Sequence, residues 1–147
     1  MKITLKDGSQ LEYSEAKPLY AIAGDISEGL MRASLAADVN GTVCDMGTVV
    51  DTDCTVNFLT FDDQKGKDTL RHTASHILAQ AVKRLYPDAK LAIGPAIENG
   101  FYYDIDVDVS FSTDILQKIE AEMKKIVKEN LPVKRFTKSR EEALKYF

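Results

Sequence analysis

The chain contains two histidines, His72 and His76, and they stand four positions apart in a segment with helical periodicity. Side chains four residues apart lie on the same face of a helix, so these two imidazoles can share a water, a ligand or a metal ion. Because imidazole takes up and releases protons near neutral pH, the pair is a candidate for hydrolytic chemistry. The spacing alone gives equal weight to a second interpretation, in which both rings occupy a solvated or packed helix face and do no chemistry.

The histidine pair does not match a zinc-protease motif, because Thr73 stands where that motif requires a glutamate. A catalytic zinc ion also needs a third protein ligand, and the sequence holds no further histidine. The two cysteines, Cys44 and Cys54, precede the pair by a long stretch of chain, and we expect them to be buried thiols in another module. The sequence therefore predicts no metal site within these residues.

A second candidate segment runs from Gly94 to residue 104 and combines glycines with adjacent aromatic residues. Glycine permits another group to approach the backbone closely, and the aromatic residues offer a stacking face and a phenol. The pattern alone favours a plain hairpin in which Phe101 and Tyr103 pack on one side and Tyr102 faces the other.

Two long amphipathic helices and a hairpin must position these residues. The first helix is predicted over residues 69–86, with an apolar face made by Leu70, Ala74, Ile77, Ala81 and Leu85. Strands are predicted over 91–97 and 101–106 around the turn at 98–100, followed by a second helix over 112–130. Its expected apolar face consists of Ile115, Ile119, Met123, Ile126 and Val127. Residues 132–137 are expected to be extended, and Ser139 with Glu142 forms a capping box that begins a last helix.

The preceding residues have a different pattern. A hairpin is predicted over 2–6 and 10–13, then helices over 18–26 and 28–33, then extended pieces at 36–39, 47–50 and 55–60. This order is typical of a β-grasp, ubiquitin-like module. The polar stretch 62–68 is expected to be a boundary. The prediction is therefore an α+β chain with two small domains, at 1–62 and 63–147.

Length, composition and charge narrow the functional classes. With 147 residues, 44% of them hydrophobic and 29% charged, the chain is of ordinary globular composition and too short for a large catalytic domain. The net charge is −4, so the overall charge does not indicate a nucleic-acid partner. The densest basic stretch, residues 124–140, is interpreted as a solvated face. Without a long apolar run or a signal peptide, no membrane partner and a cytoplasmic location are predicted.

Several motifs together resemble a known family. Residues 71–76 (RHTASH), followed by 92–95 (AIGP) and 99–104 (NGFYYD), resemble the start of the editing domain of bacterial threonyl-tRNA synthetases. Residues 6–9 (KDGS) and 39–41 (VNG) resemble the TGS domain that precedes editing in that family. The resemblance covers essentially the whole chain in the family's order.

The resemblance implies a hydrolytic function in translation fidelity, the removal of serine mistakenly attached to tRNA(Thr). Serine lacks only one methyl group of threonine, a difference that binding alone discriminates by about 10–200-fold. In this family the positions matching His72 and His76 line the site near the tRNA 3′ end. Those matching Gly94 and Tyr103 contact the seryl group or the terminal adenosine. The family's editing mechanism needs no metal.

The chain also departs from the family. The editing pocket of the family is completed by a Cys-x-x-x-His motif further along the sequence. In this chain no cysteine follows Cys54 and no histidine follows His76. The resemblance therefore implies an amino-terminal fragment of a nucleotide-binding ligase, inactive alone and monomeric, whereas the intact enzyme is expected to be a homodimer. ATP, Mg and Zn are expected only in the catalytic core, and this chain is expected to carry no cofactor.

Two other functions remain open. The chain can be a non-catalytic TGS module that binds RNA or a protein partner, in which case changing the histidines leaves binding intact. It can also be a free-standing trans-editing hydrolase of the alanyl-tRNA synthetase type, with or without zinc.

Overall fold

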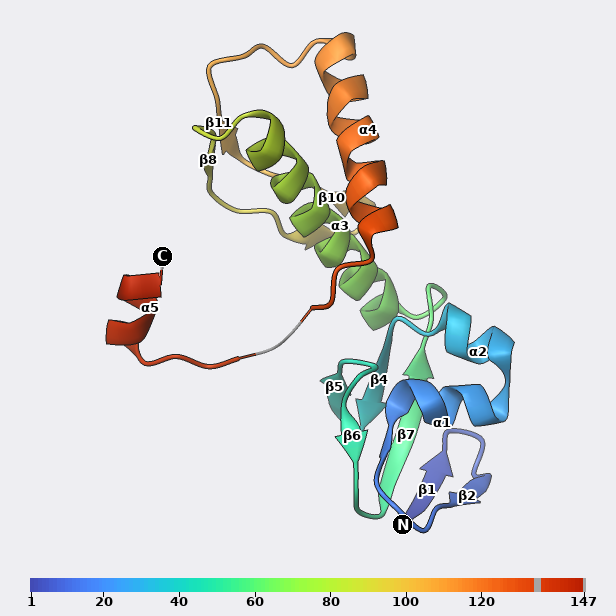
Figure 1. Cartoon of the computed structure of the whole chain (residues 1–147). Coiled ribbons are helices and arrows are strands. Elements are labelled where there is room, and N and C mark those ends of the chain that lie inside the picture. The colour runs from blue at the N-terminus through green and yellow to red at the C-terminus, as the bar shows by residue number, and fades with distance from the viewer. Residues whose placement is uncertain (134–135, 147) are drawn as a thin grey trace.

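A computed structural model describes residues 1–133 and 136–146 (Figure 1). Its first part is a five-stranded sheet in the order β2-β1-β7-β4-β5, and a short separate pair, β3 and β6, lies beside it. The strands are β1 (Lys2–Leu5), β2 (Gln10–Glu12), β3 (Lys17–Pro18), β4 (Ala36–Val39), β5 (Thr42–Cys44), β6 (Val49–Val50) and β7 (Cys54–Leu59). Two helices connect β3 to β4, namely α1 (Leu19–Ile26) and α2 (Glu28–Ala33).

Strand β1 pairs antiparallel with β2 and parallel with β7, so the first and last strands of this part lie side by side within the open sheet. Helix α1 contributes Leu19 and Ile22 to a core shared with Ile3 and Val56, all four fully buried. The predicted β-grasp is confirmed. Strand β5 was not predicted, although the residues before it carry its signal: Asn40 (φ 50) and Gly41 (φ 89) both adopt the left-handed conformation of a tight hairpin turn.

Most of the stretch predicted as a boundary, from Gln64 onward, is helical. Helix α3 (Gln64–Leu85) begins five residues before the predicted start, directly after Asp63. The Asp63 carboxylate accepts a hydrogen bond from the backbone N of Thr60 at 2.9 Å, which fixes the entry into the helix. Buried Gly66 lies so close to the strand end that an added Cβ would be 1.9 Å from the Thr60 carbonyl oxygen. The end of β7 and the start of α3 are therefore in direct backbone contact, and the bounds 1–62 and 63–147 stay a prediction.

Beyond α3 the chain forms two strand pairs and a helix. The elements are β8 (Lys90–Leu91), β9 (Ala96–Ile97), β10 (Gly100–Phe101), β11 (Ile105–Asp106) and α4 (Thr113–Glu129). Strand β8 pairs with β11 and β9 with β10, so the predicted hairpin forms but is interrupted between the two pairs. Pro95 lies in the interruption, and a proline has no N–H to donate to a ladder. Helix α4 packs along α3 (Figure 1).

The buried faces of both long helices differ from the predicted ones. Small residues of α3 form its buried face, together with one valine: Ser75, Ala79, Ala81 and Val82. Leu70 and Leu85 are exposed, and so is Val127 of α4, at 61%. The prediction that these three residues are buried was wrong. The spacing of apolar residues along one helix does not show which side of that helix the neighbouring elements cover. Ile119 and Ile126 are buried as expected, in a core with Ala81, Val82 and Ala89.

The last described helix is α5 (Arg140–Tyr146), which Figure 1 shows set apart from α3 and α4. The predicted capping box is confirmed, because the Glu142 carboxylate accepts from the backbone N of Ser139 at 2.8 Å and the Ser139 hydroxyl accepts from the backbone N of Glu142 at 3.3 Å. Of the predicted extended segment 132–137, residues 134 and 135 lie outside the described residues. Within the described ranges, none of the helices has the length and apolar character needed to cross a bilayer.

Candidate functional site

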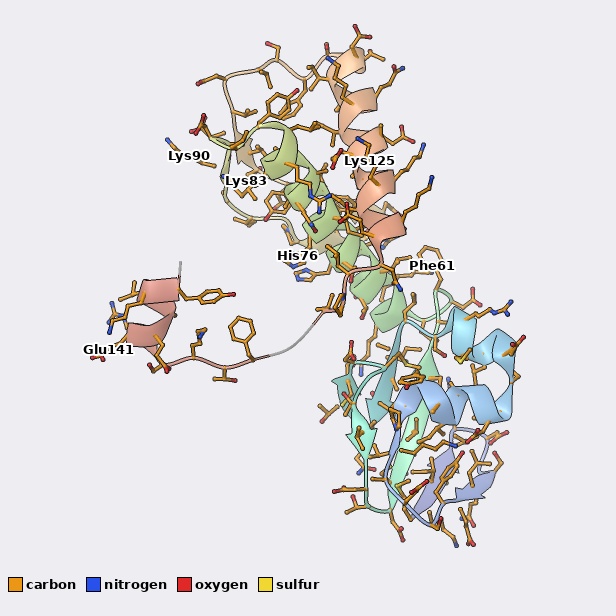
Figure 2. The ribbon with its side chains drawn as sticks, viewed as in Figure 1. Phe61, His76, Lys83, Lys90, Lys125 and Glu141 are labelled. Carbon is orange, nitrogen blue, oxygen red and sulfur yellow. The ribbon has the colours of Figure 1, made fainter. Side chains whose placement is uncertain are left out.

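Helix α3 brings His72 and His76 together. Their Nε2 atoms lie 2.9 Å apart, and the ring planes meet at 79° with centroids separated by 4.6 Å. Both residues are exposed, and Figure 2 shows His76 on the side of α3 away from α4. A hydrogen bond between two Nε2 atoms needs one donor and one acceptor, so at least one ring must be neutral. The pair is thus arranged to hold one proton between two nitrogens at the surface.

The helix backbone beneath the pair is held by a buried hydroxyl. Ser75 is 1% exposed and donates from Oγ to the His72 carbonyl oxygen at 2.8 Å. Ser75 lies between the two histidines in sequence. It is the one buried polar residue of the described core, and this bond satisfies its hydroxyl. No role was predicted for Ser75; a serine inside an otherwise apolar helical stripe is the signal that could have identified it.

Arg71 connects the histidine helix to the β9–β10 turn. Its Nη1 atom donates to the carbonyl oxygens of Ile97 at 3.1 Å and Glu98 at 2.7 Å. Arg71 belongs to a predicted motif, but its function could not be predicted, because its acceptors are backbone atoms that no side-chain pattern reveals. The contact places the two-residue turn after Ile97 beside the helix segment that carries His72.

The second predicted pair, Gly94 and Tyr103, is also in contact. Two backbone hydrogen bonds, from Ala92 N to Asp104 O at 3.0 Å and from Asp104 N to Ile93 O at 2.9 Å, place Gly94 opposite Tyr103. A Cβ at residue 94 would lie 2.2 Å from Tyr103 Cδ2. The close approach that the glycine permits is therefore that of the tyrosine ring.

The aromatic residues beside Gly94 alternate as the hairpin interpretation expects. Tyr102 is exposed, while Phe101 and Tyr103 are half-buried. Among the described residues, no hydrogen bond or ring contact joins the Gly94–Tyr103 pair to the two histidines. The structure thus makes two local contacts rather than a single closed cluster.

No group of three or more His, Cys, Asp and Glu side chains within residues 1–133 and 136–146 is placed to hold a metal ion. Cys44 and Cys54 are free thiols that pack against the sheet core, but both are half-buried rather than buried. Burial, followed by the charge of Asp53, raises the pKa of the Cys54 thiol. The expectation of fully buried thiols was therefore too strong, because each strand leaves part of its cysteine facing solvent.

The basic stretch at 124–140 is partly neutralised by its own helix. Lys124 Nζ lies 2.6 Å from Glu120 Oε1, and Lys125 Nζ lies 2.9 Å from Glu122 Oε2. Lys134 and Arg135 of this stretch lie outside the described residues. These ion pairs favour the interpretation of the basic stretch on α4 as a solvated face.

Comparison with known proteins gives consistent results. The family model of the TGS domain matches residues 1–60. Over 146 residues the chain is 62% identical to a threonine-tRNA ligase of Acetivibrio thermocellus and 60% identical to one of Clostridium novyi. A ligase of the same name from Desulforamulus reducens is 52% identical over all 147 residues. In each case the alignment covers at least 99% of this chain but only 23% of the relative, so the chain spans about a quarter of the length of these proteins.

Proposed function

This chain corresponds to the amino-terminal part of the bacterial threonine-tRNA ligases and begins with a TGS domain, and from that premise we propose that it takes part in hydrolytic editing. The proposed substrate is tRNA(Thr) that carries serine on its 3′ end. The proposed setting is the cytoplasm, within an enzyme whose ATP, Mg and Zn would serve the aminoacylation core. The observation that carries the proposal is the exposed His72–His76 pair, whose Nε2 atoms are 2.9 Å apart.

The proposed reaction is hydrolysis of an ester. A water oxygen attacks the carbonyl carbon of the seryl ester, one neutral imidazole of the pair takes the water proton, and the bond from that carbon to the ribose oxygen breaks. The ribose oxygen receives a proton, which gives free serine and a tRNA with a free 3′ hydroxyl. Because each Nε2 engages the other in the free protein, a substrate water must replace this mutual hydrogen bond before it is activated.

Gly94 and Tyr103 are proposed to contact the seryl group or the terminal adenosine. Support comes from the tyrosine ring, whose place is set by its contact with the glycine and which is only half-buried, so that part of it remains accessible for stacking. The proposed partner state is a monomer for this chain alone and a homodimer for the intact ligase. No metal is required in the proposed mechanism.

The test uses a chimaeric ligase in which this chain replaces the matching region of the Acetivibrio thermocellus relative, because that region is 23% of its length. Release of radiolabelled serine from seryl-tRNA(Thr) is measured for the unaltered chimaera and for His72→Ala and His76→Ala. Loss of a positioned acid or base typically costs about 10²–10⁴-fold, so each substitution should slow release by at least about 100-fold. Gln64→Ala, an exposed position at the start of the same helix, is the matched control and should keep full activity.

Three results would contradict the proposal. An unaltered chimaera that releases no serine would remove the editing function. Full activity in both histidine variants would make the pair structural and favour the non-catalytic TGS binding module. Stoichiometric zinc in the purified 147-residue chain would instead favour the trans-editing hydrolase of the alanyl-tRNA synthetase type.

A further inference from the structure

We propose that Arg71 is a positioning residue of the hydrolytic site, which ties the Glu98–Asn99 turn to the helical segment that carries the histidine pair. This inference rests on the proposed function. It goes beyond it by assigning a role to a residue outside the predicted site. Arg71 acts through the turn and the helix that it joins rather than by contact with the reacting atoms.

The contact is specific to one place in the fold. Among the side-chain hydrogen bonds of the described residues, the two from Arg71 Nη1 are those that join α3 to the β9–β10 pair. Strands β9 and β10 pack on α3, and Figure 1 shows β10 beside this helix. Since Arg71 directly precedes His72, its side chain ties the turn to the helical turn that carries the pair.

A second arginine on the same helix shows what a purely structural arrangement looks like. Arg84 forms a bidentate pair with Glu129 of α4, at 2.6 and 2.8 Å, and its Nη1 is 3.3 Å from Glu122 Oε1. Arg71 is bonded differently: its acceptors are two neutral carbonyl oxygens, and within the described ranges no carboxylate pairs with it. Charge pairing therefore does not account for Arg71, and its place directly before His72 favours a role in holding the turn at the site rather than in packing alone.

The turn needs this support because it is short and its strands are short. Strands β9 and β10 have two residues each, and two backbone pairs do not fix a hairpin in water. The two bonds from one guanidinium nitrogen add an anchor on the helix itself. When the anchor is lost, the turn should move relative to His72, and a displacement of about 1 Å at a reacting centre can cost about 10²-fold in rate.

The test compares Arg71→Gln, Arg71→Lys and Arg84→Gln in the chimaeric ligase described above. For Arg71→Gln we expect kcat for serine release to fall about tenfold or more, with KM within about twofold, because the ester binds but is held less well. Arg71→Lys should restore at least half of the rate, since an ammonium on a long stem can still donate to one carbonyl. Arg84→Gln should lower the melting temperature and leave kcat unchanged.

A second readout uses the 147-residue chain without substrate. Hydrogen exchange at the backbone amides of residues 97–101 should be faster in Arg71→Gln than in the unaltered chain, while Arg84→Gln should leave these amides unchanged. Equal exchange in all three proteins would overturn the inference, as would a rate loss in Arg71→Gln that Arg84→Gln reproduces. If the unaltered chimaera released no serine, the proposed function would fail first, and the two failures are thus distinguishable.

Discussion

Gly94 lies directly against the ring of Tyr103, so closely that a Cβ at residue 94 would be 2.2 Å from Cδ2, 2.4 Å from Cε2 and 2.9 Å from Cγ. These three atoms are neighbours on one side of the ring, so the ring fills the space that a Cβ at residue 94 would occupy. The tyrosine therefore cannot keep its place if residue 94 carries a side chain. This dependence of an aromatic candidate residue on a neighbouring glycine can be tested directly.

Gly94→Ala should displace the Tyr103 ring and destabilise the chain by about 1–3 kcal/mol, the usual cost of overpacking. Urea unfolding monitored by circular dichroism measures the change. Gly29→Ala is the matched control, because the nearest atom to its added Cβ is 3.9 Å away and the position is helical. It should be neutral or slightly stabilising. A stability loss in Gly94→Ala that remains when Tyr103 is also replaced by alanine would contradict the contact.

Gly66→Ala should be more damaging than Gly94→Ala, at about 3 kcal/mol, because its added Cβ would meet a backbone oxygen 1.9 Å away rather than the end of a side chain. The backbone of Thr60 is tied to Asp63 and cannot yield without breaking that hydrogen bond. Thermal unfolding of the two glycine variants, measured side by side, checks the order. A Gly66→Ala chain as stable as the parent would show that β7 and α3 do not meet as described.

Ile126→Ala and Val127→Ala differ by one position and should differ sharply in effect. Ile126 is 5% exposed and lies in the α3–α4 core, so its truncation should cost about 2–4 kcal/mol. Val127 is 61% exposed, and alanine favours helix more than valine, so its replacement should be neutral or slightly stabilising. If chemical denaturation showed equal losses of unfolding free energy in the two variants, Val127 would be buried, as the sequence predicted for the apolar face of α4.

Stability should fall at acidic pH in a manner that depends on Arg84. A hydrogen bond from Arg84 lowers the pKa of Glu129 below 4.5, and hydrogen bonds from Lys125 first and Arg84 second lower the pKa of Glu122 below the same value. A carboxyl with a lowered folded-state pKa adds stability above its unfolded pKa and loses it as pH falls through the folded value. The unaltered chain should therefore lose stability progressively below about pH 4.5.

Arg84→Gln removes part of this linkage, so its stability should depend less on pH in the same acidic range. Arg32→Gln, which removes an exposed pair with Glu28 on α2, should keep the pH profile of the unaltered chain. Melting temperatures recorded across the acidic range provide the comparison. Parallel profiles for the unaltered chain and Arg84→Gln would refute a role of Arg84 in the acid sensitivity.

Much of the fold follows from local patterns. Asp7 and Gly8 mark the first hairpin, and the capping box of Ser139 and Glu142 marks the last helix, because turn and cap chemistry depends on a few adjacent residues. The buried face of α3 could not be obtained this way. It depends on which neighbours cover the helix, and both α4 and the β9–β10 pair pack against it.

The candidate site was predictable to the extent that it lies within one helix. Four-residue spacing is enough to bring His72 and His76 together, and the structure places their Nε2 atoms within hydrogen-bond distance. The link from Arg71 to the turn was not predictable, since its acceptors are backbone carbonyls 26 and 27 positions away. Roles for the four predicted site residues stay proposals until the variants are measured.

Because β7 leads directly into α3, the sheet fixes the direction of this helix. Lys65, in the first turn of α3, reaches back to Asp38 of β4 at 2.9 Å, and Gly66 abuts the end of β7. From Gly66 to His72 the helix rises about 9 Å without interruption. The sheet therefore forms the base on which the helix that carries the imidazoles is fixed. A molecule that binds the sheet also fixes the orientation of the two rings.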